Sequence, residues 1–166
     1  GESVALVSDA GTPAVSDPGA RLVRAAVAAG IRVEPVPGAS AVMAALSAAG
    51  LPDVGFTFLG FPPFRGKDRK TWFAALDRAI VDAPVVFFEA PHRIKATLGD
   101  LTAASVEQIV VFRELTKLHE SVYRGSAADV LGQMTSIAGE FTVIVPRRQA
   151  SGEPRERPSD AVVLEM

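Results

Sequence analysis

The chain has 166 residues, of which 48% are hydrophobic, and its formal net charge is −2. This composition excludes an intrinsically disordered chain, the length allows one or two domains, and no apolar run approaches the roughly 20 residues of a transmembrane helix. The chain has no cysteine, which excludes disulfide bonds and thiolate chemistry and fits a cytoplasmic location. Because the net charge is slightly negative, a nucleic-acid partner would require a local basic patch.

The first 50 residues alternate between short apolar runs and alanine-rich segments with helical spacing. We expect strands over residues 4–7 and 31–36 and helices over residues 18–29 and 41–49. Asp17 followed by Pro18 is typical of a helix N-cap with proline at the first helical position, and Ser40 is a good N-cap for the second helix. The order strand, loop, helix, strand, loop, helix predicts part of a parallel-sheet α/β domain over residues 1–53.

Residues 54–148 show a second series of strand and helix patterns, after a short linker at residues 51–53. We expect strands over residues 56–61, 84–88, 108–113, 121–124 and 140–145, and helices over residues 71–80, 94–103 and 127–134. In the first of these helices, Trp72, Phe73 and Leu76 recur at helical spacing, which indicates a core-facing side rather than a cofactor site. Residues 149–166 are mostly polar and predict a tail outside the folded domains.

A polar loop over residues 8–19 follows the first predicted strand. Ligands of α/β proteins bind at the carboxyl ends of parallel strands, beside helix N-termini. The loop over residues 37–41 follows the next strand, so we expect the two loops to lie side by side and to offer the hydroxyl groups of Thr12 and Ser40. Hydroxyl groups, carboxylates and backbone N–H groups together suit a ligand with a ribose diol, a carboxylate and a cationic centre.

The two carboxylates of the first loop have structural explanations as well. Asp17 is explained by its position as a helix N-cap. Asp9 lies in the middle of the loop, where an aspartate can stabilise a turn. We expect Asp9, rather than Asp17, to contact a ligand.

Two clusters of charged side chains follow strands of the second domain. Glu89 ends one predicted strand, and Arg93 opens the next helix, where a cation opposes the helix macrodipole and a purely structural role is less favoured. Glu114 and Lys117 follow another strand, and an exposed face of ion pairs would explain them equally well. The two histidines of the chain have no metal-ligand spacing, so we expect no metal site.

A basic segment with aromatic neighbours follows the first strand of the second domain. Its cations are Arg65, Lys67, Arg69 and Lys70. Beside Phe64 and Trp72, these cations could hold phosphates while the rings stack on bases; a solvated charged face is the alternative. The glycine spacing over residues 60–67 does not match a P-loop, and no GxGxxG motif follows a strand, so ATP and NAD have little support.

Taken together, these segments resemble the bacterial 16S rRNA cytidine 2′-O-methyltransferase family, which belongs to the tetrapyrrole-methylase-like S-adenosylmethionine enzymes. The motifs that carry the resemblance are, in order, VSDAGTPAVSDPG, PVPGASA, ALSAAGLP, GFPP, FFEAPHR, RELTK and GEFTVIV. They cover about residues 2–146. The resemblance implies a tetrapyrrole-methylase-like α/β fold whose second domain has a mixed sheet, and an enzyme that binds S-adenosylmethionine between its two domains.

The resemblance further implies a cytoplasmic homodimer that methylates a cytidine 2′-hydroxyl in the 16S rRNA of the small ribosomal subunit, with no membrane or DNA partner. Members of the family carry an additional N-terminal segment before the part that this chain matches, so we expect the chain to be a fragment. Two alternatives remain open. One is a tetrapyrrole (precorrin-type) methyltransferase, and the other is a non-catalytic ligand- or RNA-binding fragment that dimerises through an exposed sheet edge.

The residue patterns and the resemblance together predict the site residues. The cofactor-binding candidates are Asp9, Ala10, Gly11, Thr12, Val15, Ser40, Ala41, Phe88 and Thr142. A ribose hydroxyl is a poor nucleophile, so its methylation needs a general base or a cation near the oxygen. We expect Glu89 to accept the proton and Lys117 to stabilise the alkoxide, and Glu114 is a further catalytic candidate. The RNA-binding candidates are Arg65, Lys67, Arg69, Lys70 and Arg93.

Overall fold

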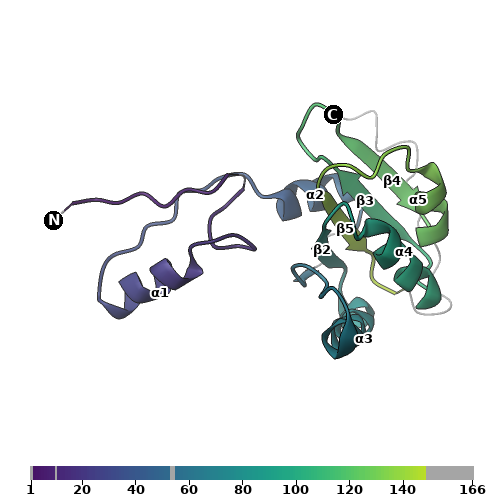
Figure 1. Cartoon of the computed structure of the whole chain (residues 1–166), viewed down its shortest axis with the longest axis horizontal. Coiled ribbons are helices and arrows are strands. Elements are labelled where there is room, and N and C mark those ends of the chain that lie inside the picture. The colour runs from purple at the N-terminus through teal and green to yellow at the C-terminus, as the bar shows by residue number, and fades with distance from the viewer. Residues whose placement is uncertain (1, 10, 53–54, 149–166) are drawn as a thin grey trace.

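The computed structural model describes residues 2–9, 11–52 and 55–148. Figure 1 shows an extended N-terminal region, drawn in purple and blue, which carries helix α1 (Ala20–Ala28) and leads into helix α2 (Ala41–Ala49) beside a twisted sheet. The remaining helices are α3 (Gly66–Asp82), α4 (Ile94–Ala103) and α5 (Ala127–Gln133). Within the described residues, the helices are too short or too polar to cross a membrane.

The sheet is mixed, as expected for the second domain. Its strands are β1 (Thr57–Phe58), β2 (Val85–Glu89), β3 (Ile109–Arg113), β4 (Ser121–Gly125) and β5 (Phe141–Val145), in the spatial order β1-β2-β5-β3-β4. Strands β1 and β2 are parallel, whereas β5 runs antiparallel to both β2 and β3. The register places Phe141 opposite both Glu89 and Arg113. The carboxyl ends of β2 and β3 therefore lie at one edge of the sheet, together with the start of β5.

The sheet separates two apolar layers because successive side chains of a strand point to opposite faces. On one face, Val86, Val110 and Ile144 pack with helix α2. On the other face, Val85, Phe87, Val111, Val143 and their neighbours pack with helices α3, α4 and α5. Residues that follow one another along a strand therefore face different environments, which decides the roles of the site residues.

Arg124 of edge strand β4 fixes helix α2 on its face of the sheet. Its guanidinium group donates hydrogen bonds to the carbonyl oxygens of Ala49 (2.7 Å) and Ala48 (2.6 Å). A cation is favourable at this end of a helix because the last carbonyl groups carry partial negative charge. At the other end of the helix, the hydroxyl group of Ser40 accepts a hydrogen bond from the backbone N–H of Met43 (3.4 Å), which confirms the predicted N-cap.

The predicted strands of the N-terminal region are wrong. Residues 4–7 and 31–36 lie outside the strands of the described structure, and Val4 and Val36 are 85% and 84% exposed. A strand is stable only where a neighbouring strand completes its backbone hydrogen bonds and another layer covers its apolar face. Neither run has such neighbours among the described residues, so their apolar pattern produces an extended segment and no sheet.

Two helix starts also differ from the predictions. Helix α1 begins at Ala20 with Gly19 at the N-cap position (φ 122°), so the predicted cap by Asp17 is wrong. Residues 12–18 instead form turns, in which the N–H of Ala14 donates to the carbonyl oxygen of Pro18 (3.3 Å). Helix α3 begins at Gly66, earlier than expected, because the charged residues after Gly66 are good helix formers and Asp68 lies favourably in the first turn.

Candidate functional site

The loops over residues 8–19 and 37–41 contact each other directly. The hydroxyl group of Thr12 donates a hydrogen bond to the carbonyl oxygen of Ala39 (3.1 Å). Gly11 adopts a left-handed conformation (φ 73°), and a Cβ atom added there would lie 3.8 Å from the same carbonyl oxygen. A residue without a side chain suits this position because of its positive φ. The two loops thus form one surface, and the cofactor candidates Thr12, Gly11 and Ser40 lie on it.

The first loop also reaches the edge of the sheet where β1 and β2 end. A Cβ atom added to Gly60 would lie 3.9 Å from the hydroxyl oxygen of Ser16. The carbonyl oxygen of Gly60 accepts a hydrogen bond from the N–H of Phe88 (2.9 Å), and the ring of Phe61 packs on the ring of Phe88, with 5.5 Å between centroids. The loop therefore lies close to Phe88, a cofactor candidate from the second half of the chain.

The other cofactor candidates are distributed as follows. Thr142 lies opposite Phe88 in the sheet register and is buried, on the face that α2 covers. Val15 is 52% exposed, and the side chain of Asp9 is exposed as well. Ala10 lies outside the described residues. A ligand at this surface would therefore meet exposed polar groups from the first loop and an apolar wall at Phe88.

Glu89 does not face the same side as Phe88, which changes its role. Glu89 is 1% exposed, and its side chain lies on the face that α4 covers. One carboxylate oxygen accepts hydrogen bonds from the hydroxyl group of Thr97 (2.6 Å), and the other accepts the backbone N–H of Ala90 (2.7 Å) and pairs with Nε of Arg93 (2.9 Å). A general base must reach the proton that it removes. We therefore revise the prediction that Glu89 accepts a proton from substrate.

Lys117 and Glu114 form a compact charged turn at the end of β3. The ammonium group of Lys117 lies 3.2 Å from a carboxylate oxygen of Glu114 and 2.8 Å from one of Glu140. The same Glu114 oxygen accepts the backbone N–H of Glu140 (2.8 Å). The hydrogen bond to Glu140 raises the pKa of Lys117 above its usual 10.5, and the second contact, with Glu114, adds to this effect. Two hydrogen bonds lower the pKa of Glu114 below 4.5: the larger effect comes from the backbone N–H of Glu140 and the second from the ammonium group of Lys117.

Backbone strain is concentrated in the first polar loop (residues 8–19) and in the charged turn after β3. Non-glycine residues with positive φ cost energy and cluster at functional sites. Among the described residues they are Ala14 (67°), Ser16 (58°), Ser105 (55°), Glu114 (51°) and Thr116 (65°). All except Ser105 belong to the first polar loop or to the charged turn. This distribution supports a functional role for both segments, independently of side-chain chemistry.

Gly139 is required for the charged turn and offers a direct test of it. A Cβ atom at this position would lie 2.5 Å from Cγ of Glu114, and Gly139 has φ +100°. We expect Gly139→Ala to displace Glu114 from Lys117 and to lower the free energy of unfolding by about 1–3 kcal/mol. Thermal unfolding would measure this, with Gly132→Ala as the matched control because a Cβ there has open space. Equal stability of the two variants would contradict this account of the turn.

The predicted RNA-binding cations separate into two groups. Arg65, Lys67 and Lys70 are exposed. Arg69 and Arg93 have side chains that are only 14% and 17% exposed, and both donate hydrogen bonds to backbone carbonyl groups of the chain itself. Their guanidinium groups are used in internal contacts, so the prediction that they hold RNA phosphates is revised. The neighbouring residues in the sequence do not show which of these cations are exposed and which are half-buried.

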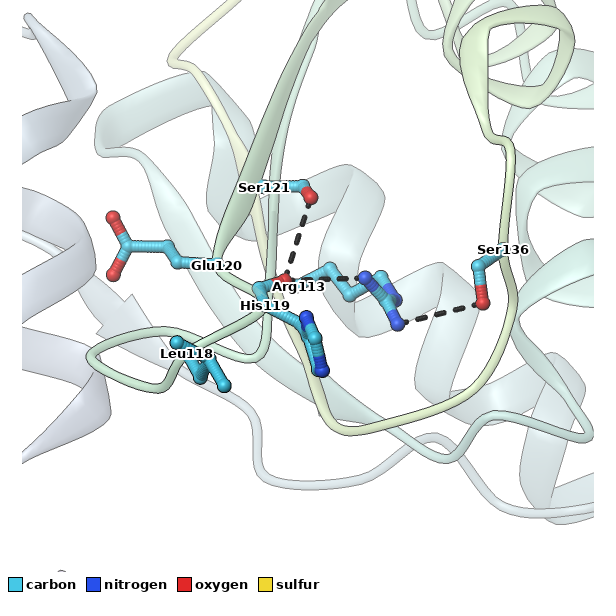
Figure 2. Close-up of a pocket in the computed structure, with 6 residues that line it drawn as sticks. All are labelled: Arg113, Leu118, His119, Glu120, Ser121 and Ser136. Atoms are coloured by element: carbon cyan, nitrogen blue, oxygen red, sulfur yellow. Dashed lines mark hydrogen bonds between the residues drawn. The ribbon is translucent and has the colours of Figure 1, made fainter.

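Next to the charged turn lies a shallow cavity of about 550 Å³ around Arg113 (Figure 2). Arg113 donates hydrogen bonds to the carbonyl oxygens of Ala138 (2.6 Å) and His119 (3.1 Å) and approaches the hydroxyl group of Ser136 (3.4 Å). It thereby joins the turn after β3 to the loop before β5. This link and the contact of Glu140 with Lys117 could not be predicted from the sequence, because both depend on β3 and β5 being neighbours in the sheet.

Known proteins resemble this chain over most of its length. A family model described as Tetrapyrrole (Corrin/Porphyrin) Methylases matches residues 1–131. The chain is 51% identical over 154 residues to the ribosomal RNA small subunit methyltransferase I of Xylella fastidiosa, a match that covers 87% of the chain and 55% of the relative. For the protein of the same name from Halalkalibacterium halodurans, the identity is 42%, covering 94% of the chain and 54% of the relative. The chain thus spans about half the length of the curated relatives it matches.

Solved structures agree with this assignment at the level of the fold. A diphthine synthase superposes with a TM-score of 0.63 at 14% identity, covering 84% of this chain and 59% of that one. A uroporphyrin-III C-methyl transferase from Thermus thermophilus, complexed with S-adenyl homocysteine, gives 0.53 at 17% identity, covering 81% and 62%. With its mixed α/β sheet and the family model that matches most of its residues, the chain belongs to the tetrapyrrole (corrin/porphyrin) methylase family.

Proposed function

We propose that this chain takes part in S-adenosylmethionine-dependent methylation of a ribose 2′-hydroxyl group in the 16S rRNA of the small ribosomal subunit. One observation carries the proposal: relatives at 42–51% identity over most of the chain bear the name ribosomal RNA small subunit methyltransferase I. The surface formed by the two polar loops and the charged turn after β3, which carries Lys117, supply groups of the required kind.

The surface formed by the two loops suits S-adenosylmethionine. The carboxylate of Asp9 can accept hydrogen bonds from a ribose diol, and the loop backbone of small residues can approach a ligand closely. Val15 and Phe88 add apolar contacts. When bound, the cofactor supplies an electrophilic methyl group on a sulfonium centre. The contribution of the chain is to hold that group in line with the ribose oxygen, since alignment accounts for several kcal/mol of barrier reduction in comparable reactions.

Lys117 is the residue that we assign to the reacting oxygen. Its ammonium group is protonated at neutral pH, and the hydrogen bonds to Glu140 and then to Glu114 raise its pKa further. The ribose hydroxyl group gives its proton to solvent water as its oxygen takes the methyl group, and a fixed positive charge near that oxygen stabilises the alkoxide character that develops. Lys117 therefore acts as an electrostatic group and not as a base, and Glu114 is a positioning residue for it. Glu89 has no direct part in this chemistry.

The exposed cations Arg65, Lys67 and Lys70 form the RNA surface in this proposal. Each can neutralise a phosphate group without losing an internal hydrogen bond that the structure describes. The resemblance found in the sequence also supports a cytoplasmic location and a homodimeric state, and the proposal includes these two properties. The tetrapyrrole alternative has weaker support. The uroporphyrin-III methyltransferases are only 17–20% identical to this chain, and similarity at that level indicates a shared fold and not a shared substrate.

The test measures both ligands on matched variants. We expect the chain to bind S-adenosylmethionine in calorimetry and a short single-stranded RNA in fluorescence anisotropy. Changing Arg65, Lys67 and Lys70 together to glutamine should reduce the steepness of log affinity against log salt concentration by about 2. This is the change expected when three phosphate contacts to a single strand are lost. The cofactor affinity should not change. A control with the exposed Arg24, Arg32 and Arg78 changed to glutamine should keep the original slope.

The outcomes distinguish the alternatives. Methyl transfer to small ribosomal subunits, and not to a precorrin-type tetrapyrrole, would support the proposal. Transfer to the tetrapyrrole would contradict it. If the wild-type chain binds neither S-adenosylmethionine nor RNA, the proposed activity does not belong to this part of the protein.

A further inference from the structure

The loop between β1 and α3 presents aromatic rings to solvent. Phe61 is 45% exposed and Phe64 is 64% exposed. The guanidinium carbon of Arg65 lies 5.6 Å from the ring centroid of Phe64. Exposed rings beside cations are favourable places for nucleobases, because every base has a π face that can stack on an aromatic side chain.

Two arginines hold this loop through consecutive carbonyl groups. Arg93 donates a hydrogen bond from Nη1 to the carbonyl oxygen of Pro62 (3.1 Å), and Arg69 donates from Nη1 to that of Pro63 (3.0 Å). Proline has no backbone N–H, so these carbonyl groups are the polar backbone groups by which the two positions can be fixed. The arginines come from α3 and from the N-cap of α4, and they bind the loop to the body of the domain.

Glu89 and Thr97 connect the two arginines under the loop. Thr97 is fully buried; its hydroxyl oxygen accepts a hydrogen bond from Nη2 of Arg69 (2.9 Å) and its proton is donated to Glu89 (2.6 Å). Glu89 pairs in turn with Nε of Arg93 (2.9 Å). The contacts therefore run from one proline carbonyl to the next through Arg69, Thr97, Glu89 and Arg93. The link between Glu89 and Arg93 is an ion pair in which Nε of Arg93 makes no hydrogen bond in the described structure, and the other links are hydrogen bonds. Together these contacts restrain the two arginines and, through them, the loop.

We propose that this network fixes Phe61 and Phe64 as a rigid platform on which an unpaired base of the RNA substrate stacks. Glu89 and Thr97 are positioning residues that act through Arg93 and Arg69. A platform that is rigid before binding loses less conformational entropy when the base arrives. Phosphate groups on either side of the base would meet the exposed Lys67 and Lys70. The inference rests on the proposed RNA substrate and adds the base contact and the residues that support it.

The experiment compares two valine substitutions on the same helix. Thr97→Val removes the hydroxyl group that joins Arg69 to Glu89, whereas Thr102→Val removes a hydroxyl group that only contacts the helix backbone at Leu98. Fluorescence anisotropy would measure binding of a single-stranded RNA of about 10 nucleotides, a length that covers one typical binding site. We expect Phe64→Ala and Thr97→Val each to weaken binding about tenfold, and Thr102→Val to leave it unchanged.

A double variant separates positioning from a general loss of structure. If Thr97 acts through the platform, Thr97→Val adds little once Phe64 is already alanine, so the two effects are not additive. Additive losses, or equal effects of Thr97→Val and Thr102→Val, would contradict the inference. RNA binding that is insensitive to Phe64→Ala would overturn the platform while leaving the proposed function intact. A wild-type chain that binds S-adenosylmethionine but no RNA would instead overturn the proposed RNA substrate, and the platform with it.

Discussion

Replacing Lys117 by methionine is expected to lower kcat for ribose methylation by about 10²–10³-fold, the usual effect of removing one group that stabilises a developing oxyanion. Methionine keeps most of the side-chain length and removes the charge. The cofactor affinity should remain close to that of the wild type, because Lys117 is assigned to the substrate oxygen. Single-turnover methyl transfer to small ribosomal subunits, together with calorimetry for S-adenosylmethionine, would measure the two quantities separately.

The pH dependence gives an independent check on Lys117. Its pKa is raised above 10.5, so the ammonium group is present at neutral pH and is lost only as the pH rises through that raised value. The pKa of Glu114 is lowered below 4.5, so its carboxylate is present at neutral pH and is lost only as the pH falls through that lowered value. Activity carried by Lys117 should therefore not decline between pH 6 and 9 through either group. Lys117→Arg should retain part of the activity, and full activity of Lys117→Met would refute the assignment.

Replacing Glu89 by alanine is expected to lower the free energy of unfolding by about 3–5 kcal/mol, because removal of one partner of a buried ion pair leaves the other charge without compensation. The stranded cation is Arg93, whose Nε is buried. Urea denaturation would measure the loss. Glu107→Ala is the matched control, since Glu107 is exposed and surface substitutions usually change stability by less than about 0.5 kcal/mol.

A second substitution shows whether the stranded charge is the cause. In Glu89→Ala combined with Arg93→Met, the uncompensated cation is removed as well, so the double variant should be more stable than Glu89→Ala alone. Glu89→Gln should be less damaging than Glu89→Ala because the amide oxygen can still accept the Thr97 hydroxyl proton. If Glu89→Ala were no less stable than Glu107→Ala, the buried network would not have the structural importance that we give it.

Most elements of the second domain follow from local sequence patterns, although β1 covers only Thr57–Phe58 of the strand predicted over residues 56–61. Helix α4 has the predicted bounds Ile94–Ala103, and β2, β3 and β5 lie within one residue of the predicted ends. Hydrophobic periodicity and local turn residues act over a few positions, so they can be read without knowledge of the fold. The N-terminal strands could not be predicted in the same way, because an apolar run becomes a strand only when another strand pairs with it.

In the candidate site, too, some features could be predicted from local sequence and others depend on tertiary contacts. The residue types at 8–19, 37–41 and 113–120 predicted these segments as candidate site loops, and the structure brings Thr12 to Ala39 and Lys117 to Glu114. Residue types did not separate Glu114, on an exposed turn, from Glu89, under a helix. Both are glutamates at the end of a buried strand, and only their surroundings differ.

The amino-acid sequence alone determined the order of helices and strands in the second domain and the family resemblance, since these depend on periodicity and on ordered motifs. The tertiary structure decided which face each side chain occupies. Adjacent residues Phe88 and Glu89 point to opposite sides of the sheet, and the helices that cover each side place Phe88 in the apolar layer beside α2 and Glu89 in a buried polar network under α4. The packing partners of a face come from distant parts of the chain, so local sequence carries no record of them.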